Sequence, residues 1–98
     1  MLLEIEFHKG ASKDTEDSFV WYENQKTGLG LRFLVCIEVA LSIIKDNPLL
    51  FAVTYKDFRR APVEVFPFSI YYKIKGDAII IVGIMHQKRN YKVLAKRR

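Results

Sequence analysis

Two clusters of basic side chains in the second half of the chain offer its clearest potential for chemistry. The first cluster consists of Lys56, Arg59 and Arg60, and the second consists of His86, Lys88 and Arg89. Residues 51–98 carry eleven lysines and arginines and three acids, whereas residues 1–50 carry five and eight. This asymmetry favours an anionic partner, either a nucleic acid or an acidic protein segment. The alternative is a solvated basic region that only aids solubility.

Other catalytic chemistries lack a signature in the sequence. We find no nucleophile elbow, no HExxH motif and no glycine-rich phosphate loop. The glycines at 28–30 fit the turn that starts a helix. The single cysteine, Cys36, can form no internal disulfide, and no Cys/His spacing is typical of zinc. The sequence therefore predicts no cofactor and no metal site.

The apolar segments are too short to cross a membrane. The N-terminal run contains Glu4 and Glu6, so it does not resemble a signal peptide. The run Ala78–Met85 is far shorter than the roughly 20 residues that a transmembrane helix needs. We therefore expect a cytoplasmic protein that makes no membrane contact.

The length and composition fit one domain that spans residues 1–98. Half of the residues are hydrophobic and 13% are aromatic, which is enough to bury a single core. A strand is predicted at Leu2–Phe7, and a first helix at residues 11–25, where Gly and Pro are absent. Lys26-Thr27-Gly28 interrupts this helix. The short link to the next helix makes the two antiparallel neighbours.

The second helix is predicted at Leu29–Asp46 by an apolar stripe with the period of one helix face. The stripe residues are spaced by 4, 4 and 3 positions: Phe33, Ile37, Leu41 and Ile44. Asn47-Pro48 stops the helix, because proline cannot continue it and disfavours helical angles in the residue before it.

The rest of the chain alternates with a period of two and predicts three strands. Val63 and Val65 flank Glu64, residues 69–74 place Ile70, Tyr72 and Ile74 on one face, and Ala78–His86 is rich in β-branched residues. Pro67 makes a corner and Lys75-Gly76-Asp77 a tight turn. Because the last strand is apolar on both faces, it should be central and covered on both sides. The predicted class is α+β, in the order β-α-α-β-β-β, with a helical hairpin on an antiparallel sheet.

The two basic clusters bracket this predicted meander. One lies at the start of its first strand and the other at the end of its last. The first and third strands of an antiparallel meander run in the same direction, so these positions lie at opposite ends. The clusters would form one site only if the C-terminal tail folded back across the sheet.

Five segments in this order resemble the RelE/ParE toxin superfamily. They are WYENQKTGLGLRFL from Trp21, IIKDNP from Ile43, the pair Arg59-Arg60, FPFSIYY from Phe66, and IIIVGIMHQKR from Ile79. Ala11 and Asp14 also resemble the apolar–Ala–acidic spacing that is usual at the start of the family's first helix. The resemblance covers nearly the whole chain, from about Trp21 to Arg89, and the family's fold is the one predicted above.

The resemblance implies the toxin component of a type II toxin–antitoxin (plasmid stabilisation) system, and it leaves three alternatives for activity. ParE-like members inhibit DNA gyrase. RelE-like members bind the ribosome and cleave mRNA, as endoribonucleases. The third alternative is an inactive or repurposed member. We favour the ParE-like interpretation, because Ala95 stands about where RNA-cleaving members often carry a C-terminal tyrosine.

The candidate site residues would have different roles in the two active alternatives. In a nuclease, His86 would be the acid or base, Arg89 would be catalytic with it, and Arg59 and Arg60 would hold the phosphate. Lys56 and Lys88 would neutralise charge, and Tyr91 would stack on a base. In a gyrase inhibitor, the same residues would contact the target or the antitoxin. Each also has a purely structural interpretation, such as strand capping by His86 or ion pairing by Arg59 and Arg60.

The resemblance also implies a protein partner. Toxins of this family are neutralised by a cognate antitoxin, whose extended or helical segment lies along the sheet or the helices in a hetero-oligomer. An acidic amphipathic segment would suit the basic second half of this chain.

Overall fold

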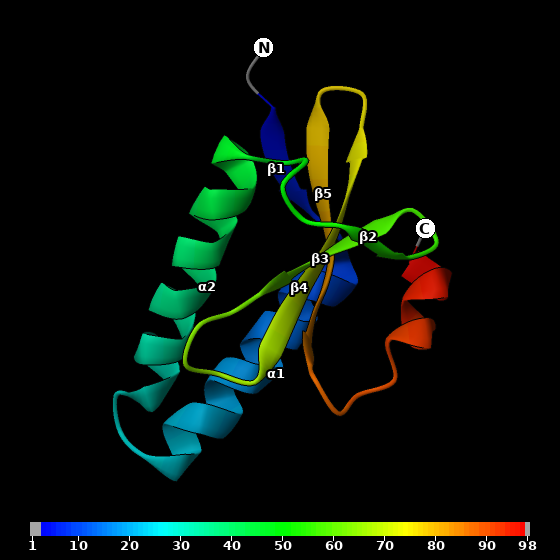
Figure 1. Ribbon diagram of the computed structural model, residues 1–98. Coiled ribbons are helices and arrows are strands. Elements are labelled where there is room, and N and C mark those ends of the chain that lie inside the picture. The colour runs from blue at the N-terminus through cyan, green and yellow to red at the C-terminus, as the bar shows by residue number, and fades with distance from the viewer. Residues whose placement is uncertain (1–2, 98) are drawn as a thin grey trace.

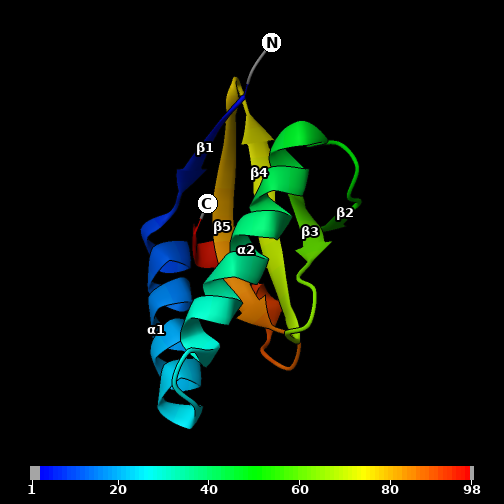
Figure 2. The ribbon, with the colours of Figure 1, turned by 90° about the vertical axis from the view of Figure 1, so that its left-hand side faces the viewer.

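A computed structural model of the protein describes residues 3–97 (Figure 1). A five-stranded sheet has a helical hairpin on one face and a short C-terminal 3₁₀ helix on the other (Figures 1 and 2). The predicted α+β class and its helical hairpin are confirmed. The elements in chain order are β1 (Glu4–Phe7), α1 (Lys9–Gln25), α2 (Leu29–Asp46), β2 (Val53–Tyr55), β3 (Phe58–Pro62), β4 (Phe68–Lys75), β5 (Ala78–His86) and the 3₁₀ helix η1 (Tyr91–Arg97).

Helix α2 has the predicted bounds, and helix α1 starts two residues before its predicted start at residue 11. The reason is His8, whose Nδ1 accepts a hydrogen bond from the Gly10 amide at 2.9 Å and so caps the helix. The core stripe of α2 includes Phe33, Ile37 and Ile44, all buried against the sheet. The predicted strand start at Leu2 lies outside the described residues.

Glycine at position 30 allows the two helices to approach closely. A Cβ atom there would lie 2.7 Å from the Phe19 carbonyl oxygen of α1. The Glu23 carboxylate of α1 accepts hydrogen bonds from the Gly28 and Gly30 amides, both at 2.9 Å. It thereby satisfies two amides that the first turn of α2 leaves without helical partners. The helical hairpin is therefore fixed at the end where its helices join.

The strand order is β1-β5-β4-β3-β2, so β5 lies inside the sheet between β1 and β4, as predicted for a strand that is apolar on both faces. The helical hairpin covers one face of β5, and η1 packs against the other. The prediction of a purely antiparallel sheet was wrong in one respect, because β1 pairs with β5 in parallel, from Glu4 opposite Ala78 to Phe7 opposite Ile81. A parallel pair needs a long crossover between its strands. Here the helical hairpin and the intervening strands supply it.

The prediction of a strand at Val63–Val65 was also wrong. The strand lies earlier, at β3, and forms a hairpin with β2 that the sequence pattern did not indicate. Residues 63–67 form a loop between β3 and β4, in which Val65 adopts a positive φ of 73° and is 72% exposed. The register of β3 with β4 ends where Pro62 lies opposite Ser69, and one further hydrogen bond, from the Val63 amide to the Phe68 carbonyl at 3.0 Å, closes the loop. The corner predicted at Pro67 lies in this loop.

We expect Tyr72→Phe to lower the free energy of unfolding by about 1 kcal/mol at neutral pH. The buried Tyr72 hydroxyl donates to the Pro48 carbonyl at 2.7 Å and secures the segment after α2. Burial raises the pKa of Tyr72 above its ordinary value, although the Arg59 charge and a backbone hydrogen bond oppose the shift. The neutral phenol is therefore favoured in the folded state. The stability that it contributes is complete below the ordinary tyrosine pKa and is lost as the pH rises through the folded-state pKa.

Urea denaturation of both proteins between pH 7 and 11 measures this effect. Wild-type stability should fall more steeply above pH 10 than that of Tyr72→Phe. Parallel curves for the two proteins would show that Tyr72 does not contribute to the alkaline loss.

Candidate functional site

The sheet face that carries η1 combines tyrosine rings with basic side chains. The Tyr91 ring lies 5.1 Å from that of Tyr55 and 6.1 Å from that of Tyr71, between ring centroids. The Lys56 ammonium lies 5.3 Å from the centre of the Tyr55 ring. Arg60 is exposed and pairs in register with Tyr71, so its side chain leaves the sheet on the same face. We call this face of the sheet, opposite the helical hairpin, the outer face. It brings together three of the predicted site residues, Lys56, Arg60 and Tyr91.

A buried carboxylate holds the C-terminal tail against the sheet. Asp14 of α1, 7% exposed, accepts hydrogen bonds from Arg97 at 2.6 and 3.2 Å and from the Ile84 amide at 3.1 Å. The Arg97 side chain is itself only 15% exposed, and it also donates to the Val82 carbonyl. The tail therefore folds back across the outer face, which the sequence left undecided.

Two glycines make room for this Asp14–Arg97 clamp. A Cβ atom at Gly10 would lie 2.5 Å from Nε of Arg97, and one at Gly83 would lie 2.6 Å from the Leu94 side chain. Leu94 belongs to η1 and is fully buried against β5. The close packing of η1 on α1 and β5 thus depends on small residues in both elements. The sequence indicated Asp14 through its spacing from Ala11, but it gave no sign that Arg97 would be the partner.

Arg89 shares the same carboxylate. Its Nη1 lies 3.3 Å from Oδ1 of Asp14, and 49% of its side chain is exposed. About half of the Arg89 side chain is therefore accessible to a partner, while Asp14 offsets part of its charge. Arg89 therefore has a structural partner in Asp14 and also an exposed part that can contact another molecule.

Arg59 and Arg60, adjacent in sequence, lie on opposite faces of the sheet. Arg59 pairs with Tyr72, whose ring is buried beneath the helices, and its Nη1 donates to the Phe51 carbonyl at 2.6 Å. It therefore secures the segment between α2 and β2, with a backbone carbonyl as its partner. Arg60 is the one of the two that points to the outer face.

His86 and Lys88 belong to a third location, at the end of β5. The His86 ring packs edge-on against Phe68 at 5.3 Å, and Phe68 belongs to the core beneath the helices. Nδ1 of His86 accepts a hydrogen bond from the Lys88 amide at 3.1 Å. His86 therefore lies on the helical side of the sheet, and Arg60 and Tyr91 on the outer side. Of the predicted nuclease residues, His86 and Arg89 share one turn, in which the Arg89 amide donates to the His86 carbonyl at 3.0 Å, whereas Arg60 and Tyr91 lie on the other face of the sheet.

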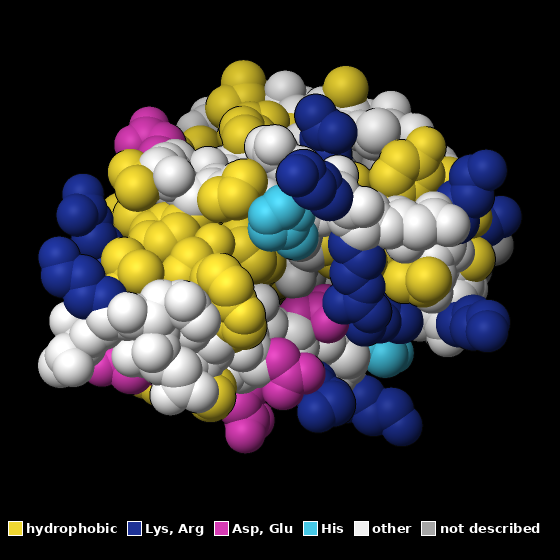
Figure 3. Space-filling model, turned by 90° about the horizontal axis from the view of Figure 1, so that it is seen from below, with side chains coloured by type: hydrophobic (Ala, Val, Ile, Leu, Met, Phe, Trp, Pro, Cys, Tyr) yellow, Lys and Arg dark blue, Asp and Glu magenta, His cyan; other side chains and the backbone are white. Residues whose placement is uncertain are grey.

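The lower end of the molecule is both apolar and basic. Figure 3 shows hydrophobic side chains gathered beside a histidine, with a row of lysine and arginine side chains on its other side. Within residues 3–97 no group of three or more His, Cys, Asp or Glu side chains could hold a metal ion. In the same part of the chain, no helix has the length and apolar character to span a bilayer.

The architecture is similar to that of a solved structure from a ParDE system. A solved structure described as "Chromosomal ParDE TA system from P. aeruginosa" superposes with a TM-score of 0.78. The two sequences are 18% identical, and the alignment covers 87% of this chain and 96% of the other. A comparison with curated proteins found no match. The two proteins therefore share the fold of two helices on one sheet.

The family assignment comes from the sequence itself. The model of one family, described as "ParE toxin of type II toxin-antitoxin system, parDE", matches residues 5–91. The chain belongs to this ParE toxin family. The predicted resemblance to the RelE/ParE superfamily is confirmed, and so is the predicted role as the toxin component of a type II toxin–antitoxin system.

Proposed function

We propose that this toxin arrests growth in the cytoplasm by binding DNA gyrase, without cleaving RNA. The observation that carries the proposal is the separation of His86 from Arg60 and Tyr91 by the full thickness of the sheet. RNA cleavage by the 2′-hydroxyl needs a proton acceptor, a proton donor and cations around one phosphate. These residues cannot all reach a single phosphate from opposite faces of the sheet.

The two other arginines of the predicted site, Arg59 and Arg89, support the same conclusion. Arg59 is engaged with the Phe51 carbonyl, and Arg89 shares the Asp14 carboxylate with Arg97. Both have structural partners that would compete with a substrate phosphate. A toxin that acts through contact needs only an accessible surface, and Lys56, Arg60, Lys88 and half of Arg89 provide exposed positive charge.

The cognate antitoxin would cover the side of the helical hairpin that faces away from the sheet. Helix α2 exposes an apolar stripe of Leu31, Val35, Val39 and Ile43, with exposed fractions between 40% and 61%. Beside it, a groove of about 460 Å³ runs between α1 and α2, lined by Phe7, Ser12, Thr15, Glu16, Phe19 and Leu34. An amphipathic helix buries its apolar face in such a groove. We call the groove lined by these six residues the hairpin groove.

Induced expression of the chain without its antitoxin tests the proposal. We expect thymidine incorporation to fall within minutes, cells to filament, and total transcripts to stay intact. Gyrase loss stops replication first, whereas a ribosomal nuclease stops methionine incorporation and fragments mRNA. Rapidly cut transcripts would contradict the proposal, and normal growth would show an inactive member of the family.

A further inference from the structure

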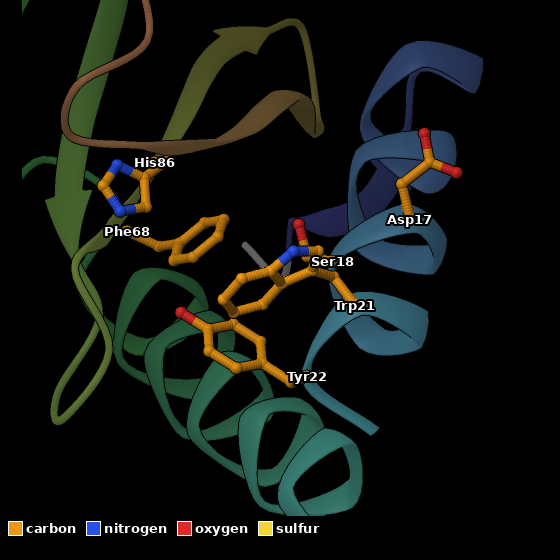
Figure 4. Close-up of a pocket in the computed structure, with 6 residues that line it drawn as sticks. All are labelled: Asp17, Ser18, Trp21, Tyr22, Phe68 and His86. Atoms are coloured by element: carbon orange, nitrogen blue, oxygen red, sulfur yellow. The ribbon is translucent and has the colours of Figure 1, made fainter. Parts of the chain in front are cut away.

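A second cavity lies at the lower end of the molecule, between α1 and the ends of β4 and β5. It has a volume of about 300 Å³ and is lined by Asp17, Ser18, Trp21, Tyr22, Phe68 and His86. Figure 4 shows the rings of Trp21, Tyr22 and Phe68 turned toward one another, with His86 at the edge. Phe68 is buried, whereas Trp21 is 58% exposed. We call this cavity the aromatic pocket.

The walls of the aromatic pocket are fixed by the core. The Tyr22 ring packs 5.1 Å from Trp21, 4.8 Å from Phe66 and 6.0 Å from Phe68, between ring centroids. Burial raises the pKa of the Tyr22 hydroxyl. A preformed pocket binds without a large ordering cost. Trp21, which is exposed at the mouth of the pocket, can therefore contact a partner protein without a large rearrangement.

The turn that leaves the aromatic pocket after the lining residue His86 is basic, and we call this turn the rim of the pocket. Because Nδ1 of His86 accepts the Lys88 amide hydrogen, the neutral ring carries its proton on Nε2 and can donate it. Lys88 is exposed, and half of Arg89 is exposed. On the α1 side, Asp17 pairs with Lys13 at 3.4 Å, and its carboxylate points away from the rings in Figure 4. The rim thus favours an acidic group beside an apolar one.

The aromatic pocket and the hairpin groove lie on different faces of α1. The groove uses residues 12, 15, 16 and 19 of the helix, and the pocket uses residues 17, 18, 21 and 22. At 100° per residue the mean directions of these two sets differ by roughly 140°. A helical segment that fills the groove therefore leaves the pocket to a different contact.

We propose that the aromatic pocket anchors the toxin on its target protein by taking one apolar side chain that is flanked by a carboxylate. This inference rests on the function proposed above and names the surface that performs it. Interface energy concentrates in a few anchors, among which tryptophan, tyrosine and arginine are enriched, and these anchors sit in pockets from which water is excluded. The pocket offers this combination, and the basic rim fits an acidic neighbour.

Binding of purified DNA gyrase to the immobilised full-length chain tests the inference. Trp21→Ala should raise the Kd at least tenfold, because it removes one aromatic wall of the pocket that holds the target's side chain. Its exposure means that the fold should survive, which the melting temperature would verify. Leu50→Ala removes a side chain of similar exposure, 62%, from the loop before β2, and it should change the Kd less than twofold.

A charge reversal adds an independent test. Lys88→Glu should weaken binding about three- to tenfold at low salt and less at high salt, because the rim charge is exposed. Unchanged binding by Trp21→Ala, or equal losses in Trp21→Ala and Leu50→Ala, would overturn the pocket assignment while the proposed target stands. A wild-type chain that does not bind gyrase would overturn the proposed target, and the assignment with it.

Discussion

Asp14→Asn is expected to lower the free energy of unfolding by about 3 kcal/mol. The substitution removes the charge that compensates the Arg97 guanidinium, whose side chain is only 15% exposed. Removing one member of a buried ion pair is costly because the other charge stays buried without compensation. For a domain of this size the loss is a large fraction of the total stability. Urea denaturation of wild type and variant measures it.

The matched control is Asp17→Asn, on the same helix. The Lys13–Asp17 pair is exposed at both ends, with side-chain exposures of 76% and 64%, so its loss should change stability by no more than about 0.5 kcal/mol. We also expect limited proteolysis to cut Asp14→Asn after β5, because η1 loses its clamp. Equal stabilities of the two variants would show that the tail is held by Leu94 and its apolar neighbours instead.

Val35→Asp is expected to weaken binding of the cognate antitoxin at least a hundredfold. An aspartate in the apolar stripe of α2 would be buried without a partner beneath the antitoxin, which costs several kcal/mol. Val35 is 59% exposed in the free toxin, so the fold itself should tolerate the change. The measurement is growth of cells that produce antitoxin together with either toxin. Wild type should be neutralised, and Val35→Asp should arrest growth.

Glu38→Gln provides the comparison for this experiment. Glu38 is an exposed polar residue of the same helix, outside the apolar stripe, and its substitution should leave neutralisation unchanged. If Val35→Asp is neutralised as completely as wild type, the antitoxin does not use the α2 stripe. Its contacts would then have to lie on the sheet.

Elements with a strong local signal were predictable from the sequence. The stripe of α2 repeats with the helical period, so its bounds could be read directly. Strand β5 is apolar on both faces, which indicated its central place before any pairing was known. The same use of sequence periodicity gave the wrong result for residues 63–67, which form a loop. Val63 and Val65 alternate as a strand would, whereas the true strand β3 contains Arg59 and Arg60 and ends at Pro62, residues that are not typical of a strand pattern.

The grouping of the site residues could not be predicted, because it depends on contacts between distant parts of the chain. Arg97 meets Asp14 across 83 positions, and this contact directs the tail over the outer face. The tail in turn places Tyr91 beside Tyr55 and Tyr71. Trp21 and His86 form one pocket only because α1 packs against the end of β5. Among these residues the sequence indicated His86, Tyr91 and Asp14, and the face of the sheet on which each side chain lies follows from register and packing.

The most direct test of the account is gyrase supercoiling of relaxed plasmid DNA in the presence of the purified toxin. We predict inhibition that increases with toxin concentration and is reversed by the antitoxin, with no cleavage of mRNA on ribosomes treated in parallel. Full supercoiling activity at every toxin concentration, together with cut mRNA on the ribosomes, would contradict the account.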